Sequence, residues 1–345
     1  MTAPALEADL PELRDRKAEH LQLALDPRMQ IAESFFDEWH FEHRALPEID
    51  LADIDTSTTF LGRRLAAPLL VSCMTGGTET ANDINLNLAA GAQRRSVAVG
   101  VGSQRPAIED PLQSQSFQVR AVAPSVPLLA NLGAVQLNYG FGIAQCRRAV
   151  EMIEADALVL HLNPLQEALQ PEGQTNFSGL LAKMKRVVDG LDVPVIAKEV
   201  GSGISETAAR SLSDIGIRII DTAGRGGTSW ARIEAARAGD LPIGELFASW
   251  GLPTPESIRQ TRRVPGVTVI GSGGVRNGVD VAKALALGAD LAGLAYPFLE
   301  PATRSAEAVA ERIDQLVAEL RITMFCLGVR NLAELRQVKL ERDPR

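Results

Sequence analysis

Cysteine is scarce in this sequence, with three residues at positions 73, 146 and 326 of 345. Their number is odd, they lie far apart, and none forms the Cys-x-x-Cys spacing of many zinc and redox sites. This composition argues against a disulfide framework and against a structural zinc site. We therefore expect the chain to work in a reducing compartment.

Long apolar runs and an excess of positive charge are also absent. No apolar run approaches the ~18 residues that a membrane-spanning helix needs, and residues 1–15 are acidic and lack the apolar stretch of a secretory signal. The formal net charge of −8 disfavours general nucleic-acid binding, which relies on a basic surface. We expect a soluble, cytoplasmic protein that binds neither membranes nor nucleic acid.

Short apolar runs recur at regular intervals instead. Most are continuous rather than alternating, as expected for strands covered on both faces. The eight runs span residues 67–74, 97–102, 126–133, 157–163, 194–200, 218–224, 267–274 and 289–297. Segments with helical spacing lie between them at 82–94, 142–154, 178–190, 205–214 and 278–287. This α/β alternation predicts a parallel sheet, and eight units favour a closed (β/α)8 TIM barrel over an open doubly wound sheet.

The barrel has terminal additions and no low-complexity linker, so we predict one domain over 1–345. Its parts are an N-terminal extension and substrate lid at 1–60, the barrel at 61–300, and a C-terminal helix and tail at 301–345. Within them, residues 10–25 have the pattern of an amphipathic helix, and 35–41 that of a packing segment. We expect a long closing helix at 301–327 and a frayed tail at 336–345.

Glycine-rich turns follow the last strands. "GSGGV" ends the seventh run, and Gly278 precedes the next apolar helix. Backbone N–H groups of such a turn and a helix N-terminus attract phosphate, which barrels commonly bind after strands seven and eight. A tight turn without a ligand is the alternative. After the sixth run, "GRGGTSW" adds the Thr228 and Ser229 hydroxyls, and Ser229 also suits the N-cap of a helix beginning near Trp230.

Lys198 lies inside the fifth apolar run, "VIAKEV". Burying a lysine is costly unless it meets an anion or a dipole. It could extend to the rim, or it could form a Schiff base or stabilise negative charge on a cofactor. The period of two places Glu199 on the opposite face, as a structural partner.

The fourth run ends in a polar cluster, "HLNPLQE". Period-two spacing points His161 and Asn163 into the barrel, with Gln166 and Glu167 in the loop above. One carboxylate together with substrate phosphates is a common Mg²⁺ arrangement. The plainer alternative is a structural histidine and a rim carboxylate.

Two further groups of polar residues suit an anionic ligand. "MTGG", "GSQR" and "NLG" place polar groups at the same rim, where Ser103 and Arg105 could hold an anion or form a plain surface turn. Arg16, Lys17 and His20 share one face of the N-terminal helix. That face is either solvated or a lid that brings positive charge to a phosphorylated substrate.

Taken in order, "RKAEH", "MTGGT", "GSQR", "NLGA", "HLNPLQE", "KEVGSG", "GGTSWARIE" and "SGGVRNG" resemble the type 2 isopentenyl-diphosphate isomerase family over almost the whole chain. The resemblance implies a barrel that binds FMN, reduced by NADPH, and interconverts isopentenyl and dimethylallyl diphosphate with Mg²⁺. It also implies a homotetramer or homo-octamer. An FMN-dependent oxidase or dehydrogenase of a small substrate is the nearest alternative, and a non-catalytic scaffold barrel a more distant one.

The resemblance also assigns residues to roles. It implies catalytic roles for Lys198, Gln166 and His161, and a Mg²⁺ ligand in Glu167. The implied substrate contacts are Arg16, Lys17, His20, Ser103, Gln104, Arg105, Asn163 and Gln166. The implied FMN contacts are Met74, Thr75, Gly76, Ser103, Asn131, Lys198, Thr228, Gly273, Gly274, Val275, Arg276, Ala295 and Tyr296.

Overall fold

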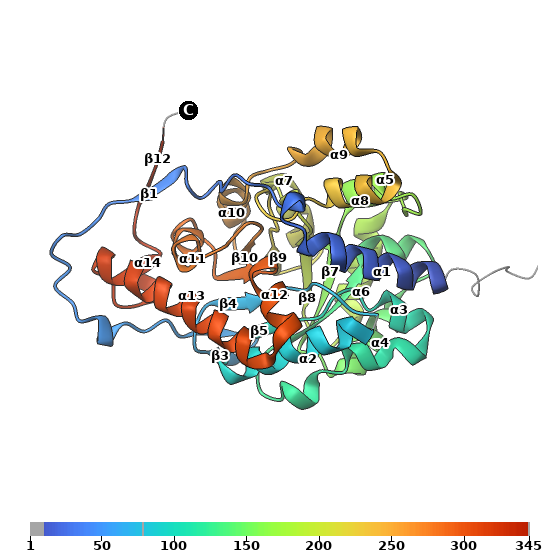
Figure 1. Ribbon diagram of the computed structural model, residues 1–345, viewed down its shortest axis with the longest axis horizontal. Helices are drawn as coiled ribbons and strands as arrows, with labels where there is room; N and C mark the ends of the chain where they lie inside the picture. Colours follow the sequence, from blue (N-terminus) through green and yellow to red (C-terminus); the bar gives the residue numbers. More distant parts are fainter. Residues whose placement is uncertain (1–9, 78, 344–345) are drawn as a thin grey trace, which may run out of the picture.

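A closed barrel of eight parallel strands forms the centre of the molecule (Figure 1), in a computed structural model that describes residues 10–77 and 79–343. The strands are β4 (Leu69–Val71), β5 (Ala98–Gly100), β6 (Leu128–Gly133), β7 (Ala157–Leu162), β8 (Val195–Glu199), β9 (Ile219–Asp221), β10 (Thr268–Ser272) and β11 (Leu291–Leu294). Pairing of β11 with β4 closes the barrel. Each strand lies within one of the predicted apolar runs, so the predicted barrel is confirmed.

Apolar side chains fill the N-terminal end of the barrel interior. A hairpin of β2 (Thr58–Phe60) and β3 (Arg63–Leu65) contributes the buried Phe60 and Leu65, which pack against inward-facing strand residues such as Leu129 and Ile196. A larger apolar cluster fills the space between the barrel and its helices. Because apolar side chains fill the N-terminal end, the C-terminal end is left for polar residues.

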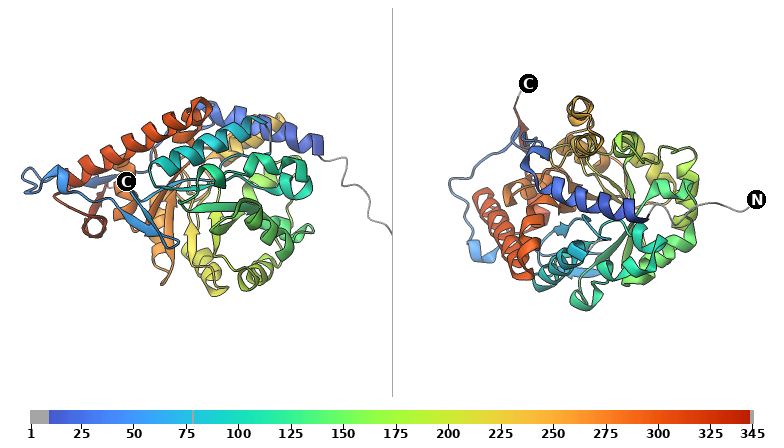
Figure 2. Two further views of the ribbon diagram at one scale, coloured as in Figure 1. Left: turned by 90° about the horizontal axis from the view of Figure 1, so that it is seen from below. Right: turned by 45° about the vertical axis from the view of Figure 1, so that its right-hand side comes forward.

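Helices surround the barrel (Figure 2). The larger ones are α2 (Glu79–Arg94), α4 (Ile143–Ile153), α6 (Leu180–Gly190), α7 (Glu206–Asp214), α8 (Trp230–Ala238), α9 (Leu241–Ala248), α10 (Thr254–Arg262) and α11 (Gly278–Ala286). The short helices are α3 (Arg105–Glu109), α5 (Pro164–Leu169) and α14 (Leu332–Leu335). The five predicted segments match α2, α4, α6, α7 and α11 to within three residues, whereas α9 and α10 were not predicted. Ser229 caps α8 as the sequence suggested, because its hydroxyl accepts from the Arg232 N–H.

The N-terminal helix α1 (Leu10–Leu25) has the predicted bounds and packs against α8 and α12 (Tyr296–Arg304). In the right-hand view of Figure 2 it crosses one end of the barrel. The predicted packing segment is also confirmed, since Phe35, Phe36 and Trp39 are buried.

The C-terminal region departs from the prediction in two places. The long closing helix is present as α13 (Ala306–Leu327), but residues 301–304 belong to α12, because Ser305 is extended and its hydroxyl caps α13 by accepting from Ala308 N–H. The tail is not frayed over β12 (Leu340–Arg342), which pairs antiparallel with β1 (Trp39–Phe41). Arg342 also lies over the Trp39 ring, 5.4 Å from its centroid, and pairs with Glu38.

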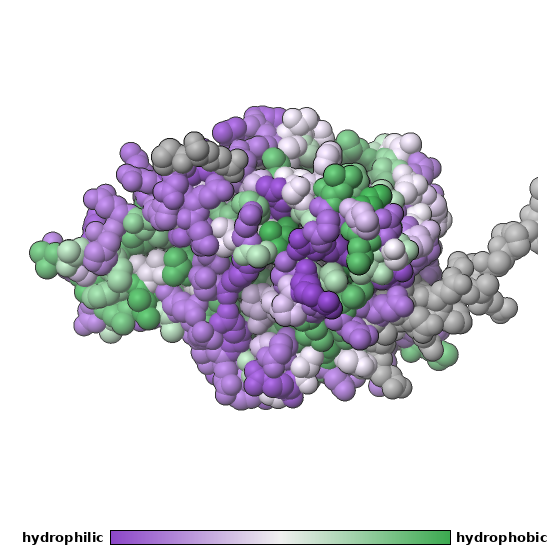
Figure 3. All heavy atoms as spheres, turned by 45° about the horizontal axis from the view of Figure 1, so that its top comes forward, coloured by the Kyte–Doolittle hydropathy of each residue, from purple (hydrophilic) through white to green (hydrophobic). Residues whose placement is uncertain are grey.

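The surface drawn in Figure 3 is mostly hydrophilic, with scattered apolar residues. Large exposed apolar side chains include Leu241, Leu246 and Trp250, on and just after α9. Within residues 10–77 and 79–343, no helix has the length and apolar character needed to cross a bilayer.

Candidate active site

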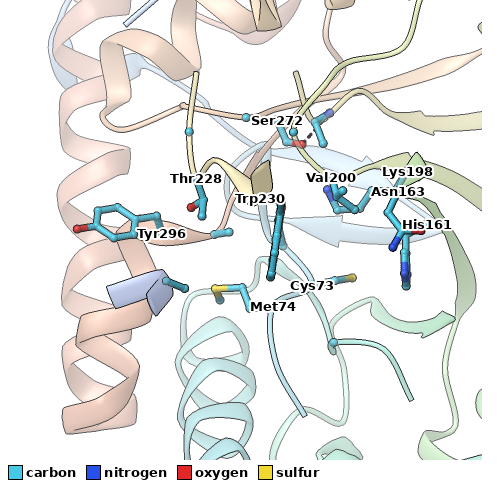
Figure 4. Close-up of a pocket in the computed structure, with 18 of the residues that line it drawn as sticks. Cys73, Met74, His161, Asn163, Lys198, Val200, Thr228, Trp230, Ser272 and Tyr296 are labelled. Carbon is cyan, nitrogen blue, oxygen red and sulfur yellow. Dashed lines mark hydrogen bonds between the residues drawn. The ribbon is translucent and has the colours of Figure 1, made fainter. Parts of the chain in front are cut away.

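The C-terminal ends of the strands enclose a cavity of about 240 Å³. Every barrel strand or the loop that follows it contributes to the wall, as expected when parallel strands all point to one rim. Figure 4 shows that the pocket is extended, with Tyr296 and Thr228 on one side and Lys198 and His161 on the opposite side. Met74 and Trp230 lie between them.

Most residues that the sequence singled out meet in this cavity. They are Lys17, His20, Met74, Thr75, Ser103, Arg105, Asn131, His161, Asn163, Gln166, Glu167, Lys198, Thr228, Gly273, Gly274, Val275, Arg276, Ala295 and Tyr296. The side chain of Arg16 lies outside the described residues.

Gln104 and Gly76 do not line the cavity. The Gln104 side chain is fully buried, donates to the Ala149 carbonyl of α4 at 2.8 Å and accepts from the Asn131 N–H at 2.9 Å. It therefore joins the segment after β5 to α4 and to β6 and does not face the cavity. Gly76 packs against Phe117, whose ring carbon lies 1.9 Å from where a Cβ would stand. The structure thus places both residues outside the cavity lining, behind the predicted substrate and FMN contacts.

Lys198 is held at the cavity wall by a buried counter-ion. It is 8% exposed, and its Nζ lies 3.3 Å from Oδ2 of Asp221, which is 2% exposed. The two residues are register partners on the adjacent strands β8 and β9. Asp221 also accepts from the Ser272 hydroxyl. An ion pair offsets much of the cost of burying each charge, so this lysine does not extend to the solvent.

Glu199 points away from the cavity, as predicted, and serves the backbone. Its carboxylate accepts from the N–H groups of Val200, Gly201 and Ser202. Burial raises its pKa to about 7, against these hydrogen bonds and the nearby Lys198 charge. It fixes the loop that follows β8.

His161 is a neutral hydrogen-bonding group. Its Nδ1 lies 2.8 Å from Oδ1 of Asn131. That oxygen only accepts, so Nδ1 carries the proton and Nε2 is left as an acceptor. Burial, together with the charges of Lys17 and Lys198, lowers the His161 pKa to about 3. The ring therefore stays uncharged near neutral pH.

Glu167 is a buried carboxylate on α5 with one fixed orientation. Its Oε1 accepts from Asn163 Nδ2 at 2.9 Å, and its Oε2 accepts from the Gln174 N–H at 2.6 Å. No group of three His, Cys, Asp or Glu residues in the described part of the chain could hold a metal ion. A Mg²⁺ ion at Glu167 would therefore take its other oxygen ligands from a substrate or water.

The two glycine-rich loops touch each other through their backbones. Gly273 and Gly274 have φ angles of 102° and 72°. A Cβ on Gly274 would lie 2.3 Å from the Gly226 carbonyl oxygen, and one on Gly273 would lie 2.1 Å from that of Gly224. Only glycine allows this close approach.

The helix N-terminus that faces the cavity belongs to α12, not to α11. The Gly278 N–H of α11 donates to Glu319, and the Arg276 N–H donates to Asp280. At α12, no described side chain caps the N-terminal Ala295, and Ala295 and Tyr296 line the cavity. A phosphate at this end of the pocket would meet the α12 N-terminus.

The lid face of α1 meets a carboxylate that sequence reasoning missed. His20 Nε2 lies 2.9 Å from Oε1 of the fully buried Glu234, and its ring packs edge-to-face on Trp230. The Gln166 amide donates to the same Oε1 at 2.7 Å. Burial lowers the His20 pKa, although Glu234 opposes this. The final Glu of "GGTSWARIE" was the available signal for this contact.

Other cavity residues went unassigned, among them Gln30, Ser72, Cys73, Gln136 and Trp230. Burial raises the pKa of the Cys73 thiol to about 11, so it is not a nucleophile at neutral pH.

The polar groups in the cavity wall fit FMN. Ser72 Oγ, Gln136 Oε1 and Asn163 Oδ1 are buried in the cavity wall without a hydrogen-bond partner among the described residues. Buried polar atoms without a partner are uncommon and suit a polar ligand. Lys198 on one side of the cavity suits an electron-rich ring. The α12 N-terminus on the opposite side suits a phosphate.

Known proteins resemble the chain at two levels. The FMN-dependent dehydrogenase family model matches residues 26–121 and 161–342. Among solved structures, mandelate oxidase with 3,3-difluoro-2-hydroxy-3-phenylpropionic acid has a TM-score of 0.66 at 18% identity, covering 97% of this chain and 99% of that one. A (putative) lactate oxidase of Pediococcus acidilactici has a TM-score of 0.66 at 17% identity, over 100% and 97% of the two chains. These structures support the fold alone.

Curated relatives are much more similar. Isopentenyl-diphosphate delta-isomerases of Nostoc sp. and Synechococcus sp. are 49% and 50% identical, each over 96% of this chain and 97% of its relative. That of Cronobacter sakazakii is 48% identical over the same shares. The chain therefore belongs to the isopentenyl-diphosphate delta-isomerase family, within the FMN-dependent dehydrogenases.

Proposed function

We propose that this protein interconverts isopentenyl diphosphate and dimethylallyl diphosphate with FMN in the barrel cavity. Family membership over nearly the full chain supports the reaction. The observation that carries it is a cavity whose wall holds buried polar atoms without a partner among the described residues, together with a second set of charged groups at its rim. That set comprises the basic lid residue Lys17 and the carboxylate Glu167, which suit a diphosphate and its Mg²⁺ ion.

The cavity residues would hold FMN along the long direction of the pocket. The phosphate would lie at the α12 N-terminus and the glycine loops, and the ring near Lys198, Thr75 and Asn131. When bound and reduced by NADPH, FMN supplies acid–base groups able to act on an alkene and an allylic C–H, which ordinary side chains are too weak to do. Lys198 would stabilise negative charge on the ring, since its ammonium is fixed at the wall by Asp221.

The diphosphate would bind at the outer rim. Lys17 of α1 and Arg105 of α3 line the cavity, and Glu109 holds the Arg105 guanidinium at 2.8 Å. Ser103 adds a hydroxyl, and Glu167 would bind Mg²⁺. Binding energy from this charged group orients an otherwise featureless C5 tail.

Gln166 is the side chain we place beside the reacting carbons. Its amide is oriented from two sides, by Glu234 at 2.7 Å and by Asn163 at 3.2 Å. The neutral His161 would accept a hydrogen bond at Nε2 without adding charge. The α1 lid would exclude water from the reacting carbons.

The cellular setting follows from the same proposal. The reaction supplies both five-carbon units of isoprenoid biosynthesis. We place the enzyme in the cytoplasm as a homotetramer or homo-octamer that binds a small diphosphate and no nucleic acid.

The test is to reconstitute the purified protein with FMN, NADPH and Mg²⁺ under anaerobic conditions and supply isopentenyl diphosphate. We expect dimethylallyl diphosphate as the product. Steady NADPH consumption in proportion to product would instead indicate an FMN-dependent oxidoreductase. A protein that never takes up FMN would point to a non-catalytic scaffold.

A further inference from the structure

Arg237, on the last turn of α8, joins three carboxylates. Its Nε lies 2.9 Å from Glu19, its Nη1 2.8 Å from Glu234 and its Nη2 3.0 Å from Glu172. The Arg237 side chain is 10% exposed and does not line the cavity. Each nitrogen of the guanidinium thus contacts a different carboxylate, which only the fork of an arginine allows.

The three carboxylates come from three separate parts of the chain. Glu19 is on the lid helix α1, Glu234 is on α8, and Glu172 follows α5, the helix that carries Gln166. Helix α8 packs against both α1 and α5, and Figure 1 shows the three close together. Arg237 therefore connects the lid to the segment that positions the amide in the cavity.

The contacts differ in strength because they differ in burial. Glu234 is 0% exposed, so losing its cation would leave an uncompensated buried charge. Glu19 is 56% exposed, so its pair with Arg237 is weak and easily broken. The Arg237–Glu234 pair therefore stays formed, whereas the Arg237–Glu19 pair can break when the lid opens.

The position of the lid also affects the Gln166 amide, through Glu234. Oε1 of Glu234 accepts from Gln166 and lies 2.9 Å from His20 of α1, while its Oε2 faces Arg237. When the lid is closed, His20 therefore contacts the same Glu234 oxygen that orients Gln166.

We infer that Arg237 is a positioning residue that latches α1 over the cavity and, through Glu234, sets the orientation of the Gln166 amide. This inference rests on the proposed isomerase function for the role of Gln166. The latch itself depends only on the contacts of Arg237 and Glu19. If Arg237 only stabilised α8, the Arg237–Glu19 contact would have no effect on substrate binding or turnover.

The kinetic test uses two variants and a matched control in the FMN-loaded enzyme. Glu19→Gln should raise KM for isopentenyl diphosphate roughly two- to fivefold with kcat unchanged, since it loosens only the exposed contact. Arg237→Met should raise KM about tenfold or more and also lower kcat, since it disturbs the buried Glu234. The control is Arg210→Met, which removes an exposed ion pair to Glu206 on α7 and should leave both constants unchanged.

A double variant tests whether the two residues act together. If Arg237 is the partner of Glu19, adding Glu19→Gln to Arg237→Met should raise KM no further. Independent, multiplicative effects would overturn the latch, as would wild-type KM and kcat in Arg237→Met.

Trypsin cleavage within α1, at Arg14, Arg16 or Lys17, reports the lid without an activity measurement. With Mg²⁺ and inorganic diphosphate we expect α1 to be protected in the wild type and in Arg210→Met, and to be cleaved several-fold faster in Glu19→Gln. Equal cleavage in all proteins would overturn the latch even if Arg237→Met proved unstable. A wild type that is protected but does not convert isopentenyl diphosphate would refute the proposed function and leave the latch standing.

Discussion

Replacing Lys198 with methionine would remove the cation of a buried ion pair while keeping most of the length of the side chain. Lys198 is 8% exposed and Asp221 is 2% exposed, with 3.3 Å between Nζ and Oδ2. In Lys198→Met the Asp221 carboxylate would keep the Ser272 hydroxyl as a donor but lose its counter-ion. Removing one partner of a buried pair costs about 3–5 kcal/mol of unfolding free energy. With an unfolding entropy of about 2.1 cal/mol/K per residue, the melting temperature of this 345-residue chain should fall by roughly 4–7 °C.

The same variant should lose FMN affinity or turnover by orders of magnitude, because no cation would then face the cofactor at this wall. Thermal denaturation of the FMN-free protein measures the first effect, and flavin content with isomerase activity measures the second. The double variant Lys198→Met with Asp221→Asn separates them. Since both charges are gone, stability should largely return while activity does not. A single variant with the wild-type melting temperature would refute the ion-pair argument, and a yellow, fully active one would refute the role of Lys198.

Three further predictions follow from the cavity. Glu167→Gln should raise the Mg²⁺ concentration needed for half-maximal turnover and slow turnover while FMN stays bound; unchanged Mg²⁺ dependence would remove Glu167 from that role. Gly274→Ala should weaken FMN binding in a fluorescence titration, since its Cβ would lie 2.3 Å from the Gly226 carbonyl oxygen; wild-type affinity would contradict the tight loop contact. The folded-state pKa of His161 is about 3, whereas its pKa in the unfolded chain is about 6.5. Below pH 6.5 the unfolded chain therefore takes up a proton that the folded protein does not, and the free energy of unfolding falls by up to roughly 1.4 kcal/mol per pH unit. His161→Gln should therefore lose less stability than the wild type between pH 6.5 and 4 in urea titrations, and parallel losses would contradict a buried neutral ring.

The fold could be predicted because its signals are local. Apolar runs indicated each barrel strand, helical spacing indicated α2, α4, α6, α7 and α11, and α1 has the predicted bounds. The pairing of β1 with β12 joins Trp39 to Arg342, far apart in the sequence, so no local pattern indicates it. The break at Ser305 had a local signal, a serine N-cap, which the apolar periodicity on both sides concealed.

The site was predicted where geometry follows from strand period and motif. Alternation placed His161 and Asn163 in the cavity and Glu199 away from it. It could not tell which neighbouring strand supplies the Lys198 counter-ion, because that depends on the β8–β9 register. It also could not show that Gln104, within a rim motif, turns into the packing against α4. Both outcomes depend on contacts between distant segments.

The central claim is that this barrel isomerises isopentenyl diphosphate without net oxidation or reduction. The most direct measurement is the anaerobic reaction in D₂O with FMN, NADPH and Mg²⁺, followed by mass spectrometry of the product and absorbance of NADPH. We predict dimethylallyl diphosphate that carries deuterium, formed over many turnovers while NADPH is consumed only to reduce the flavin once. Product that forms in proportion to NADPH, or unlabelled product, would contradict the account.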